Sequence, residues 1–291
     1  MGGTRFVGRA IVEVALERGH DVAMFNRGSR GNLFAGVHLI TGDRNTADIE
    51  KLAIAEWDAV IDVSAYRPQQ VRSLIDVLSG RVAHYIYIST VSVYADPVPI
   101  GADERAPLLR VDEAISADDP HAYGGLKVLC EEVLGDSWPA ALTVLRPTVV
   151  IGPHDYTDRF AWWVRAAARG GHLDLPRRLE QPVQLIDAQD LAQFVVHSLE
   201  QRISGIFNTT GPRERLTLGS MLDTLTDAFH TSVEAAIAHG GDHVPLTLAD
   251  DGSEDGVFTI DSSAAHAAGL TLRPLSESAR AVLRAARAQE C

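Results

Sequence analysis

The chain has 291 residues, of which 46% are hydrophobic and 22% charged, and this composition is that of an ordinary globular protein rather than a disordered chain. Its formal net charge of −13 opposes nucleic-acid binding, which requires clustered basic residues. No apolar run is long enough to span a membrane, and the N-terminus lacks the pattern of a signal peptide. The cysteines, Cys130 and Cys291, are too few for a disulfide framework or a cysteine metal site. We therefore expect a cytoplasmic protein with free thiols and without membrane or nucleic-acid partners.

Strand-like apolar segments alternate with helical stretches through the first half of the chain, which is typical of βαβ units and a parallel sheet. Helices are predicted at residues 7–18, 68–78 and 122–134, and strands at 20–25, 37–41, 59–64, 84–90 and 141–145. After Pro153 strands and helices no longer alternate regularly. Helices are predicted there at 160–169, 190–199, 217–229 and 275–288, and strands at 183–186 and 205–209. Loops are predicted at 176–182 and 239–255. The pattern predicts an α/β fold with a Rossmann-like, doubly wound parallel sheet.

A glycine-rich segment opens the chain and leads directly into the first helix. Its sequence is Met1-Gly2-Gly3-Thr4-Arg5-Phe6-Val7-Gly8. Glycines at the start of a helix let the backbone approach a pyrophosphate, whose charge the helix N-terminus favours, although a plain helix cap is the alternative interpretation. Because only Met1 precedes the glycines, we expect the first β-strand of the doubly wound sheet to be missing from this chain.

Basic residues follow the strand predicted at 20–25, in the order Asn26-Arg27-Gly28-Ser29-Arg30. An acidic residue at this place binds the ribose 2′-hydroxyl of NAD, whereas arginine meets the additional phosphate of NADP. Arg27 and Arg30 therefore favour NADP, with NAD as the alternative cofactor and two solvated loop arginines as the structural alternative. Asp43, after the next strand, is placed to reach the adenine edge, or simply to form a turn.

A phenol and an ammonium lie four residues apart in Tyr123-Gly124-Gly125-Leu126-Lys127, so the predicted helix presents both on one face. A nearby cation lowers the pKa of a phenol towards the working pH of a general acid or base. Lys127 is one of only two lysines in a chain that otherwise uses arginine, which indicates a position that needs a compact, titratable ammonium. The alternative is an exposed tyrosine on a solvated helix face.

Hydroxyl side chains follow the strand predicted at 84–90, in Ser89-Thr90-Val91-Ser92-Val93-Tyr94. Ligands of open α/β sheets bind at the carboxyl ends of the strands, so Thr90 is placed to hydrogen-bond a substrate oxygen. Serine and threonine also form turns at such positions without any catalytic role.

Four segments together resemble the extended short-chain dehydrogenase/reductases, the NAD(P)-dependent epimerase/dehydratase family. They are the glycine-rich start, the Ser-Thr-x-Ser-Val-Tyr strand end, the Tyr-x-x-x-Lys helix, and Arg146-Pro147-Thr148-Val149-Val150-Ile151-Gly152-Pro153. The resemblance continues through residues 183–187 and 190–192. It implies that residues 1–150 and about 181–210 form a dinucleotide-binding domain, and that about 151–180 and 211–291 form a smaller C-terminal substrate-binding region.

The resemblance also implies roles for individual residues. Thr90 corresponds to the family's catalytic Ser/Thr, Tyr123 to its acid/base, and Lys127 to the lysine that also holds the nicotinamide ribose, while Pro147 to Val150 line the nicotinamide face. The residues expected to contact the cofactor are Gly2, Gly3, Thr4, Arg5, Phe6, Val7, Gly8, Asn26, Arg27, Arg30, Asp43, Arg44, Ser64, Ala65, Tyr123, Lys127, Pro147 and Val150. A homodimer through the helices at 68–78 and 122–134 is implied as well.

Two departures from the family pattern narrow the chemistry. Arg5 replaces a glycine of the G-x-x-G-x-x-G loop, and Val91-Ser92 stand where the family's sugar-nucleotide dehydratases carry acids. A 4,6-dehydratase is therefore disfavoured, which leaves redox chemistry on a hydroxyl or carbonyl group of a small molecule, or an epimerisation through a ketone. A regulatory protein that binds NADP without turnover and an RNA-binding relative of the chloroplast type remain as alternatives.

Other residues allow two interpretations each. The 11 histidines show no metal-binding spacing, so no metal is expected. His154 and Asp155 either touch substrate or form a loop. Trp162-Trp163, together with Phe160 and Arg159, either floor a substrate pocket or belong to a helix that packs its aromatic residues into the core. The acidic residues at 250–255 are expected to solvate a loop.

Overall fold

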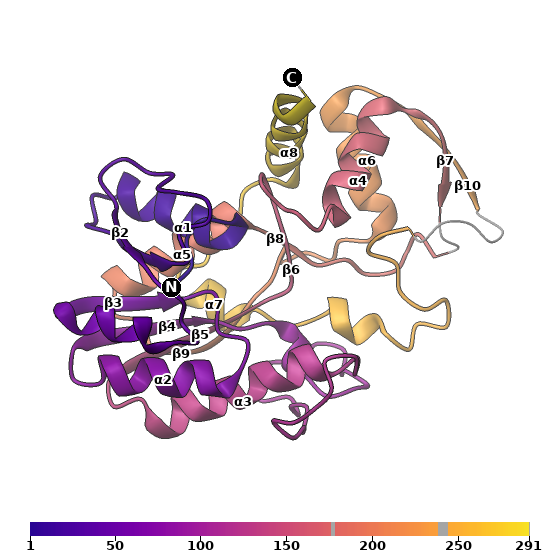
Figure 1. Ribbon diagram of the computed structural model, residues 1–291. Helices are drawn as coiled ribbons and strands as arrows, with labels where there is room; N and C mark the ends of the chain where they lie inside the picture. Colours follow the sequence, from indigo (N-terminus) through magenta and orange to yellow (C-terminus); the bar gives the residue numbers. More distant parts are fainter. Residues whose placement is uncertain (176–177, 238–243, 291) are drawn as a thin grey trace.

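The computed structural model describes residues 1–175, 178–237 and 244–290, and parallel sheets with flanking helices dominate it (Figure 1). Four parallel strands are hydrogen-bonded in the order β3 (Trp57–Asp62), β4 (Val82–Ile88), β5 (Ala141–Pro147) and β9 (Gly205–Thr209). A separate parallel pair consists of β1 (Ala23–Asn26) and β2 (His38–Thr41). The Rossmann-like α/β fold predicted from the sequence is confirmed.

Helices cover both faces of this sheet. On one face α1 (Phe6–Glu17) packs against α5 (Ala188–Glu200), and on the other α2 (Pro68–Leu78) packs against α3 (Ala122–Ser137) (Figure 1). Strand β4 explains this arrangement, because its side chains alternate between the two faces. Tyr85 and Tyr87 lie in the hydrophobic cluster with α2 and α3, whereas Ile86 and Ile88 lie in the cluster with α1 and α5.

Met1 lies between β1 and β3. Its amino group donates to the carbonyl of Ile61 at 2.8 Å, and its own carbonyl accepts from the amide of Val63 at 3.4 Å. The amide of Gly2 donates to the carbonyl of Phe25 at 3.1 Å, which connects the same segment to β1. The glycine-rich segment therefore starts at the carboxyl ends of both neighbouring strands.

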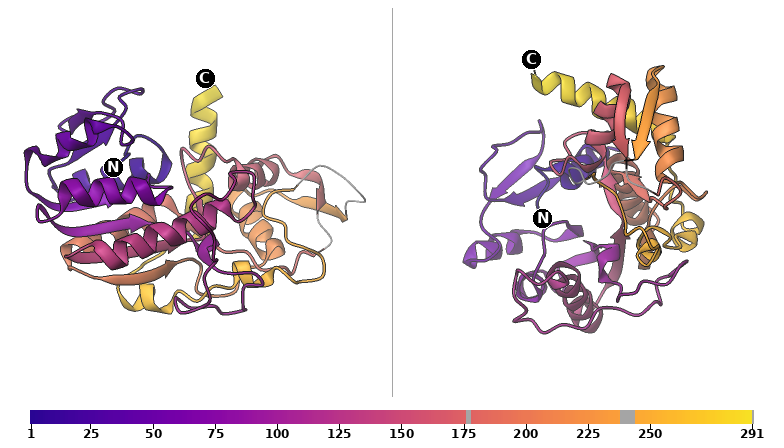
Figure 2. Two further views of the ribbon diagram at one scale, coloured as in Figure 1. Left: turned by 60° about the horizontal axis from the view of Figure 1, so that its bottom comes forward. Right: turned by 90° about the vertical axis from the view of Figure 1, so that its right-hand side faces the viewer.

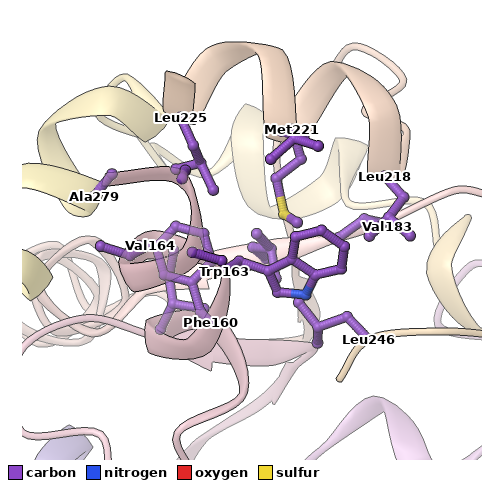
Figure 3. Close-up of a cluster of buried hydrophobic side chains, with 14 of the residues drawn as sticks. Phe160, Trp163, Val164, Val183, Leu218, Met221, Leu225, Leu246 and Ala279 are labelled. Carbon is purple, nitrogen blue, oxygen red and sulfur yellow. The ribbon is translucent and has the colours of Figure 1, made fainter. Parts of the chain in front are cut away.

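The second half of the chain builds a separate hydrophobic cluster beside the sheet. Two further parallel pairs join β6 (Val149–Ile151) to β8 (Leu185–Asp187) and β7 (Gly171–Leu175) to β10 (Val233–Ile237). The cluster is formed mainly by α4 (Arg159–Arg169), α6 (Leu218–Phe229) and α8 (Leu275–Glu290). Figure 3 shows Trp163 and Phe160 of α4 facing Met221 and Leu225 of α6. Helix α8 then runs away from the sheet towards the C-terminus (Figure 2).

The predicted helices are found within a few residues of their expected bounds, and α2 matches its range fully. The strand predicted at 20–25 starts later, at Ala23, because the amide of His20 donates to the carbonyl of Ala15 and so belongs to the end of α1. Periodicity missed the short elements η1 (Ala47–Ile54), η2 (Val91–Val93), β6, β7, β10, η3 (Asp255–Phe258) and α7 (Ser263–Ala267). Of the predicted loops, residues 176–177 and 239–243 lie outside the described residues.

Candidate functional site

A cleft of about 760 Å³ lies at the carboxyl ends of the parallel strands. The glycine-rich segment, the turn after β1, the turn after β4, the start of α3 and the end of β5 all contribute to its walls. Among the residues predicted from the sequence, those that line it are Gly2, Gly3, Thr4, Arg5, Phe6, Val7, Gly8, Asn26, Arg27, Arg30, Asp43, Arg44, Ser64, Thr90, Tyr123, Lys127, Pro147 and Val150. Ala65 does not line it, since this residue is fully buried below the surface of the cleft.

The glycine-rich segment forms a cradle at the N-terminus of α1. Gly3 has a φ angle of +98°, and a Cβ atom there would lie 2.7 Å from the sulfur of Met24, so a larger residue would strain the backbone and clash. Arg5 is the N-cap residue of α1 but makes no side-chain cap, which leaves the first amides of the helix to a ligand or to solvent. This geometry suits a phosphate group.

The turn after β1 presents donors without an acidic residue. The side-chain oxygen of Asn26 accepts from the amide of Gly28 at 2.8 Å, while its Nδ2 group is buried without a partner among the described residues. Arg27 and Arg30 line the same wall, and no carboxylate in the described part of the chain pairs with either guanidinium. Arg30 also meets Arg5 in a smaller pocket of about 190 Å³ that adjoins the cleft and whose other lining residues are Thr4, Phe6, Arg9, His154 and Tyr156. This side of the cleft therefore favours a ligand rich in acceptor oxygens and negative charge.

Arg44 and Asp62 form a buried ion pair beneath the cleft. Both terminal nitrogens of Arg44 donate to the Asp62 carboxylate at 2.8 Å, and Ser64 Oγ accepts a further hydrogen bond from Arg44 at 2.9 Å. Burial by itself would raise the pKa of Asp62, but the guanidinium outweighs this effect and holds the pKa below its usual range. The Nε group of Arg44 is buried and has no hydrogen-bond partner among the described residues. Asp43 uses its carboxylate to accept from the amide of Asn45, as a turn residue does.

Thr90 and Tyr123 meet at the end of β4. A Cβ atom on Gly124 would lie 1.9 Å from the carbonyl oxygen of Ser92, so only glycine lets α3 approach this turn so closely. The Thr90 hydroxyl accepts from the amide of Ser92 at 3.1 Å and donates to the Ser92 hydroxyl at 3.2 Å. The close packing of α3 therefore brings the Tyr123 phenol next to the Thr90 hydroxyl.

Lys127 lies one helical turn further along α3 and is 2% exposed. Its ammonium donates to the carbonyl of Ala65 at 2.9 Å and to that of Ile88 at 2.7 Å. It also lies over the ring of Tyr66, 4.9 Å from the centroid. Burial lowers the pKa of Lys127 to about 8, although the charge of Asp62 acts in the opposite direction.

The pKa of Tyr123 contradicts the expectation from the sequence. Partial burial of the phenol, followed by its neighbour Tyr66, raises the pKa of Tyr123 to about 12, although a hydrogen bond with Thr90 and the charge of Arg159 lower it. The spacing placed both side chains on one helix face, but the expected direction of the pKa shift was wrong, because burial of the phenol has the largest effect and raises the pKa. Tyr123 is consequently a neutral phenol at neutral pH and is suited to donate a proton.

A second buried network lies directly below these residues. Arg146 at the end of β5 donates to both carboxylate oxygens of Glu131 on α3, with the shortest contact at 2.6 Å. The hydroxyl of Ser89 donates to the same carboxylate, and the phenol of Tyr94 accepts from Arg146 at 3.1 Å. The network connects β4, β5 and α3 close to Thr90, Pro147 and Tyr123, which line the cleft.

Several lining residues had no signal in the sequence. They are Tyr66, Tyr156, Val257 and Phe258. The first two come from loops without a recognised motif, and the last two belong to η3, far away in the sequence, so only the tertiary fold brings them together. Arg159, expected with the tryptophans as a possible pocket floor, also lines the cleft.

Two of the open interpretations are decided by the structure. Trp163 is fully buried in the hydrophobic cluster of the second half of the chain, with Trp162 packed against it, so these residues are core (Figure 3). His154 lines the smaller pocket, whereas Asp155 accepts from the amide and hydroxyl of Thr157.

Within residues 1–175, 178–237 and 244–290, no group of histidine, cysteine, aspartate or glutamate side chains is arranged to hold a metal ion. No helix in that part of the chain has the length and apolar character needed to cross a membrane.

The fold and the cleft define a Rossmann-like α/β protein with a ligand site at the carboxyl ends of its strands. Residues 1–210 match the sequence profile of the NAD dependent epimerase/dehydratase family. The chain belongs to this family, as its motifs indicate.

Two curated proteins are similar to this chain. The "Chloroplast stem-loop binding protein of 41 kDa b" of Arabidopsis thaliana is 25% identical over 234 residues, which cover 73% of this chain and 58% of that protein. The "2-alkyl-3-oxoalkanoate reductase" of Stenotrophomonas maltophilia (strain K279a) is 31% identical over 182 residues, which cover 53% of this chain and 51% of that protein. The chain thus spans just over half the length of these relatives.

Solved structures of the same fold are also similar. The UDP-N-acetylglucosamine 4-epimerase of Bacillus cereus superposes with a TM-score of 0.72 at 20% identity, covering 99% of this chain and 94% of that one. The UDP-glucose 4-epimerase of Thermus thermophilus, solved in complex with NAD, gives a TM-score of 0.68 at 19% identity, covering 98% of this chain and 97% of that one. At these identities the likeness shows the fold.

Proposed function

We propose that this protein is an NADP(H)-dependent oxidoreductase that reduces the carbonyl group of a small molecule. The observation that carries the proposal is the meeting of Thr90, Tyr123 and Lys127 on one wall of a cleft that also contains the glycine cradle. The name of the Stenotrophomonas relative, an oxoalkanoate reductase, supports carbonyl reduction.

Residues of the cleft fit a dinucleotide. The glycine cradle at the N-terminus of α1 suits the pyrophosphate, and Asn26, Arg27 and Arg30 line the adjoining wall with polar groups suited to a ribose and its phosphate. Lys127 would hold the nicotinamide ribose, and Pro147 and Val150 would line the nicotinamide face. When bound, NADP(H) supplies the hydride that the protein lacks.

The side chains around the reacting carbonyl donate the proton and stabilise the substrate oxygen. Tyr123 donates the proton that the substrate oxygen needs as the carbonyl becomes a hydroxyl, and the hydroxyl of Thr90 hydrogen-bonds the same oxygen. Lys127 provides a positive charge near the phenolate that Tyr123 becomes once its proton has been donated. Because Val91 and Ser92 supply no acid beside Thr90, a 4,6-dehydratase remains disfavoured.

NADP rather than NAD is proposed because Arg5, Arg27 and Arg30 surround the turn after β1 without a carboxylate. An aspartate or glutamate in place of Asn26 would repel the 2′-phosphate, whereas Asn26 carries no charge.

The chemistry is tested by replacing Tyr123 with phenylalanine and following the absorbance of NADPH with a panel of aldehydes, ketones and oxo acids. Loss of the proton donor should lower kcat about 100- to 10,000-fold while NADPH binding stays unchanged. Full turnover by the Tyr123→Phe protein on a substrate that the wild type reduces would refute the assignment.

A second candidate, binding of an RNA stem-loop, is favoured by the similarity to the Arabidopsis protein. The net charge of −13 weighs against it, because polyanion binding depends on clustered cations. Retention of a labelled RNA hairpin at low salt, with release by NADPH, would favour this candidate over the enzyme.

The homodimer and the cytoplasmic location stay proposals. Helices α2 and α3 lie side by side on one face of the sheet and expose polar residues such as Asp76 and Glu132 to solvent (Figure 1). Light scattering of the purified protein decides whether this face joins two copies.

A further inference from the structure

The end of the cleft beyond Tyr123 is built from residues that no cofactor role explains. Tyr156 and Thr157 come from the segment between β6 and α4, Arg159 is the first residue of α4, and Val257 and Phe258 come from η3. Arg159 and Tyr156 are close enough to the Tyr123 phenol to influence its ionisation. A substrate whose carbonyl oxygen meets Tyr123 must therefore contact this group of residues.

Arg159 is fixed in place but leaves its terminal nitrogens open. Its Nε group donates to the hydroxyl of Thr157 at 3.1 Å, and that hydroxyl donates in turn to Asp155 at 2.7 Å. The nearest acid in the sequence, Asp158, accepts instead from Arg165, at 2.5 and 2.8 Å. No carboxylate of the described residues forms an ion pair with Arg159, so the two terminal nitrogens of its guanidinium group are available to a ligand.

The neighbours of Arg159 define what such a ligand looks like. Val257 and Phe258 present apolar surface, and the other described residues at this end carry hydroxyl or aromatic groups without charge. The ion pair of Arg178 with Asp255, at 2.8 Å, fixes the start of η3 and with it these two side chains. Arg159 beside this apolar wall matches one carboxylate next to an apolar body, whereas the other nearby cation, Arg5, lies 6.0 Å from the ring centroid of Tyr156 and belongs to the glycine cradle.

We propose that Arg159 binds the carboxylate of the substrate, so that the protein acts on an oxo acid whose apolar part lies against Val257 and Phe258. This inference rests on the proposed function, since it assumes that the carbonyl is reduced beside Tyr123. Arg159 then orients the substrate and selects it against neutral ketones.

The test compares phenylpyruvate with phenylacetone, which has a methyl group in place of the carboxylate. Each is titrated by calorimetry into the protein saturated with NADP⁺, so that binding is measured without turnover. Phenylpyruvate should bind more tightly than phenylacetone, and Arg159→Gln should weaken only the phenylpyruvate complex, by about 10- to 100-fold, as expected for a lost hydrogen-bonded charge pair. Arg159→Lys should recover part of the affinity, because lysine restores the positive charge but not the paired N–H donors of the guanidinium group.

Arg169→Gln, at the exposed far end of the same helix, is the matched control and should bind both compounds as the wild type does. Equal binding of the two compounds, no phenylpyruvate binding, or no effect of Arg159→Gln would overturn the inference. Arg159-dependent binding of phenyl phosphate in preference to phenylpyruvate would overturn the carboxylate assignment. Arg159-dependent binding of phenylpyruvate by a protein that binds neither NADP⁺ nor NAD⁺ would support the anion site and refute the proposed function.

Discussion

Replacing Glu131 by glutamine removes one charge from the buried pair that joins α3 to β5. The two side chains are 5% and 1% exposed, and the guanidinium of Arg146 donates to both carboxylate oxygens. Glutamine has nearly the same volume as glutamate but only one acceptor oxygen. Its amide NH₂ group would face a donor N–H of Arg146 that now binds the second carboxylate oxygen. Since Arg146 would then be a buried cation without a counter-charge, we expect the free energy of unfolding to fall by about 3–5 kcal/mol.

The measurement is urea unfolding followed by the fluorescence of the four tryptophans. A lower midpoint with an unchanged slope would report lost stability rather than a changed unfolded state. Glu132→Gln makes the same chemical change at the next position of α3, where the side chain is exposed, and should alter stability by no more than about 0.5 kcal/mol.

Replacing both partners separates the pair from its packing. A protein with Glu131→Leu and Arg146→Met contains no uncompensated charge, so it should recover most of the stability that Glu131→Gln loses. If Glu131→Gln and Glu132→Gln were equally stable, the buried pair would not support the fold and our reasoning about this network would be wrong.

Two more predictions concern α3. Gly124→Ala would place a Cβ atom 1.9 Å from the carbonyl oxygen of Ser92, so the free energy of unfolding in urea should fall by about 1–3 kcal/mol. Gly135→Ala has no atom within 4 Å of the added Cβ and should leave the stability unchanged or raise it. A larger loss of stability for Gly135→Ala than for Gly124→Ala would contradict the close packing of α3. The pKa of Lys127 falls from 10.5 to about 8 on folding, so the unfolded chain binds more protons between these values and stability should rise by about 3 kcal/mol as the pH increases through this window. Lys127→Met should lack that rise, and an identical pH dependence of the two proteins would show that the lysine is not desolvated.

The sequence predicts best those features that depend on local chemistry. The bounds of α2 are predicted fully, because Pro68 fixes its first turn and its apolar positions recur with helical spacing. The Tyr123 and Lys127 pair is equally visible, because residues four apart share a helix face. Each of these two features depends on the sequence of a single helix.

Features that depend on several elements could not be predicted from the sequence. The pKa of Tyr123 rises because the phenol is partly buried beside Tyr66, and the proton donors of Lys127 point to carbonyls of Ala65 and Ile88, on other elements. The approach of Phe258 to the cleft depends on the packing of η3, which carries no motif. Spacing along one helix says nothing about such neighbours.

A fluorescence titration of the protein with NADPH and with NADH shows whether the cleft binds a nicotinamide dinucleotide and which one it prefers. We expect NADPH to bind more tightly than NADH, and Arg30→Gln to weaken NADPH binding about 10- to 100-fold while leaving NADH binding nearly unchanged, because only the 2′-phosphate meets this arginine. Binding of neither nucleotide would contradict the proposed function. Equal affinity for both, unaffected by Arg30→Gln, would contradict the NADP assignment.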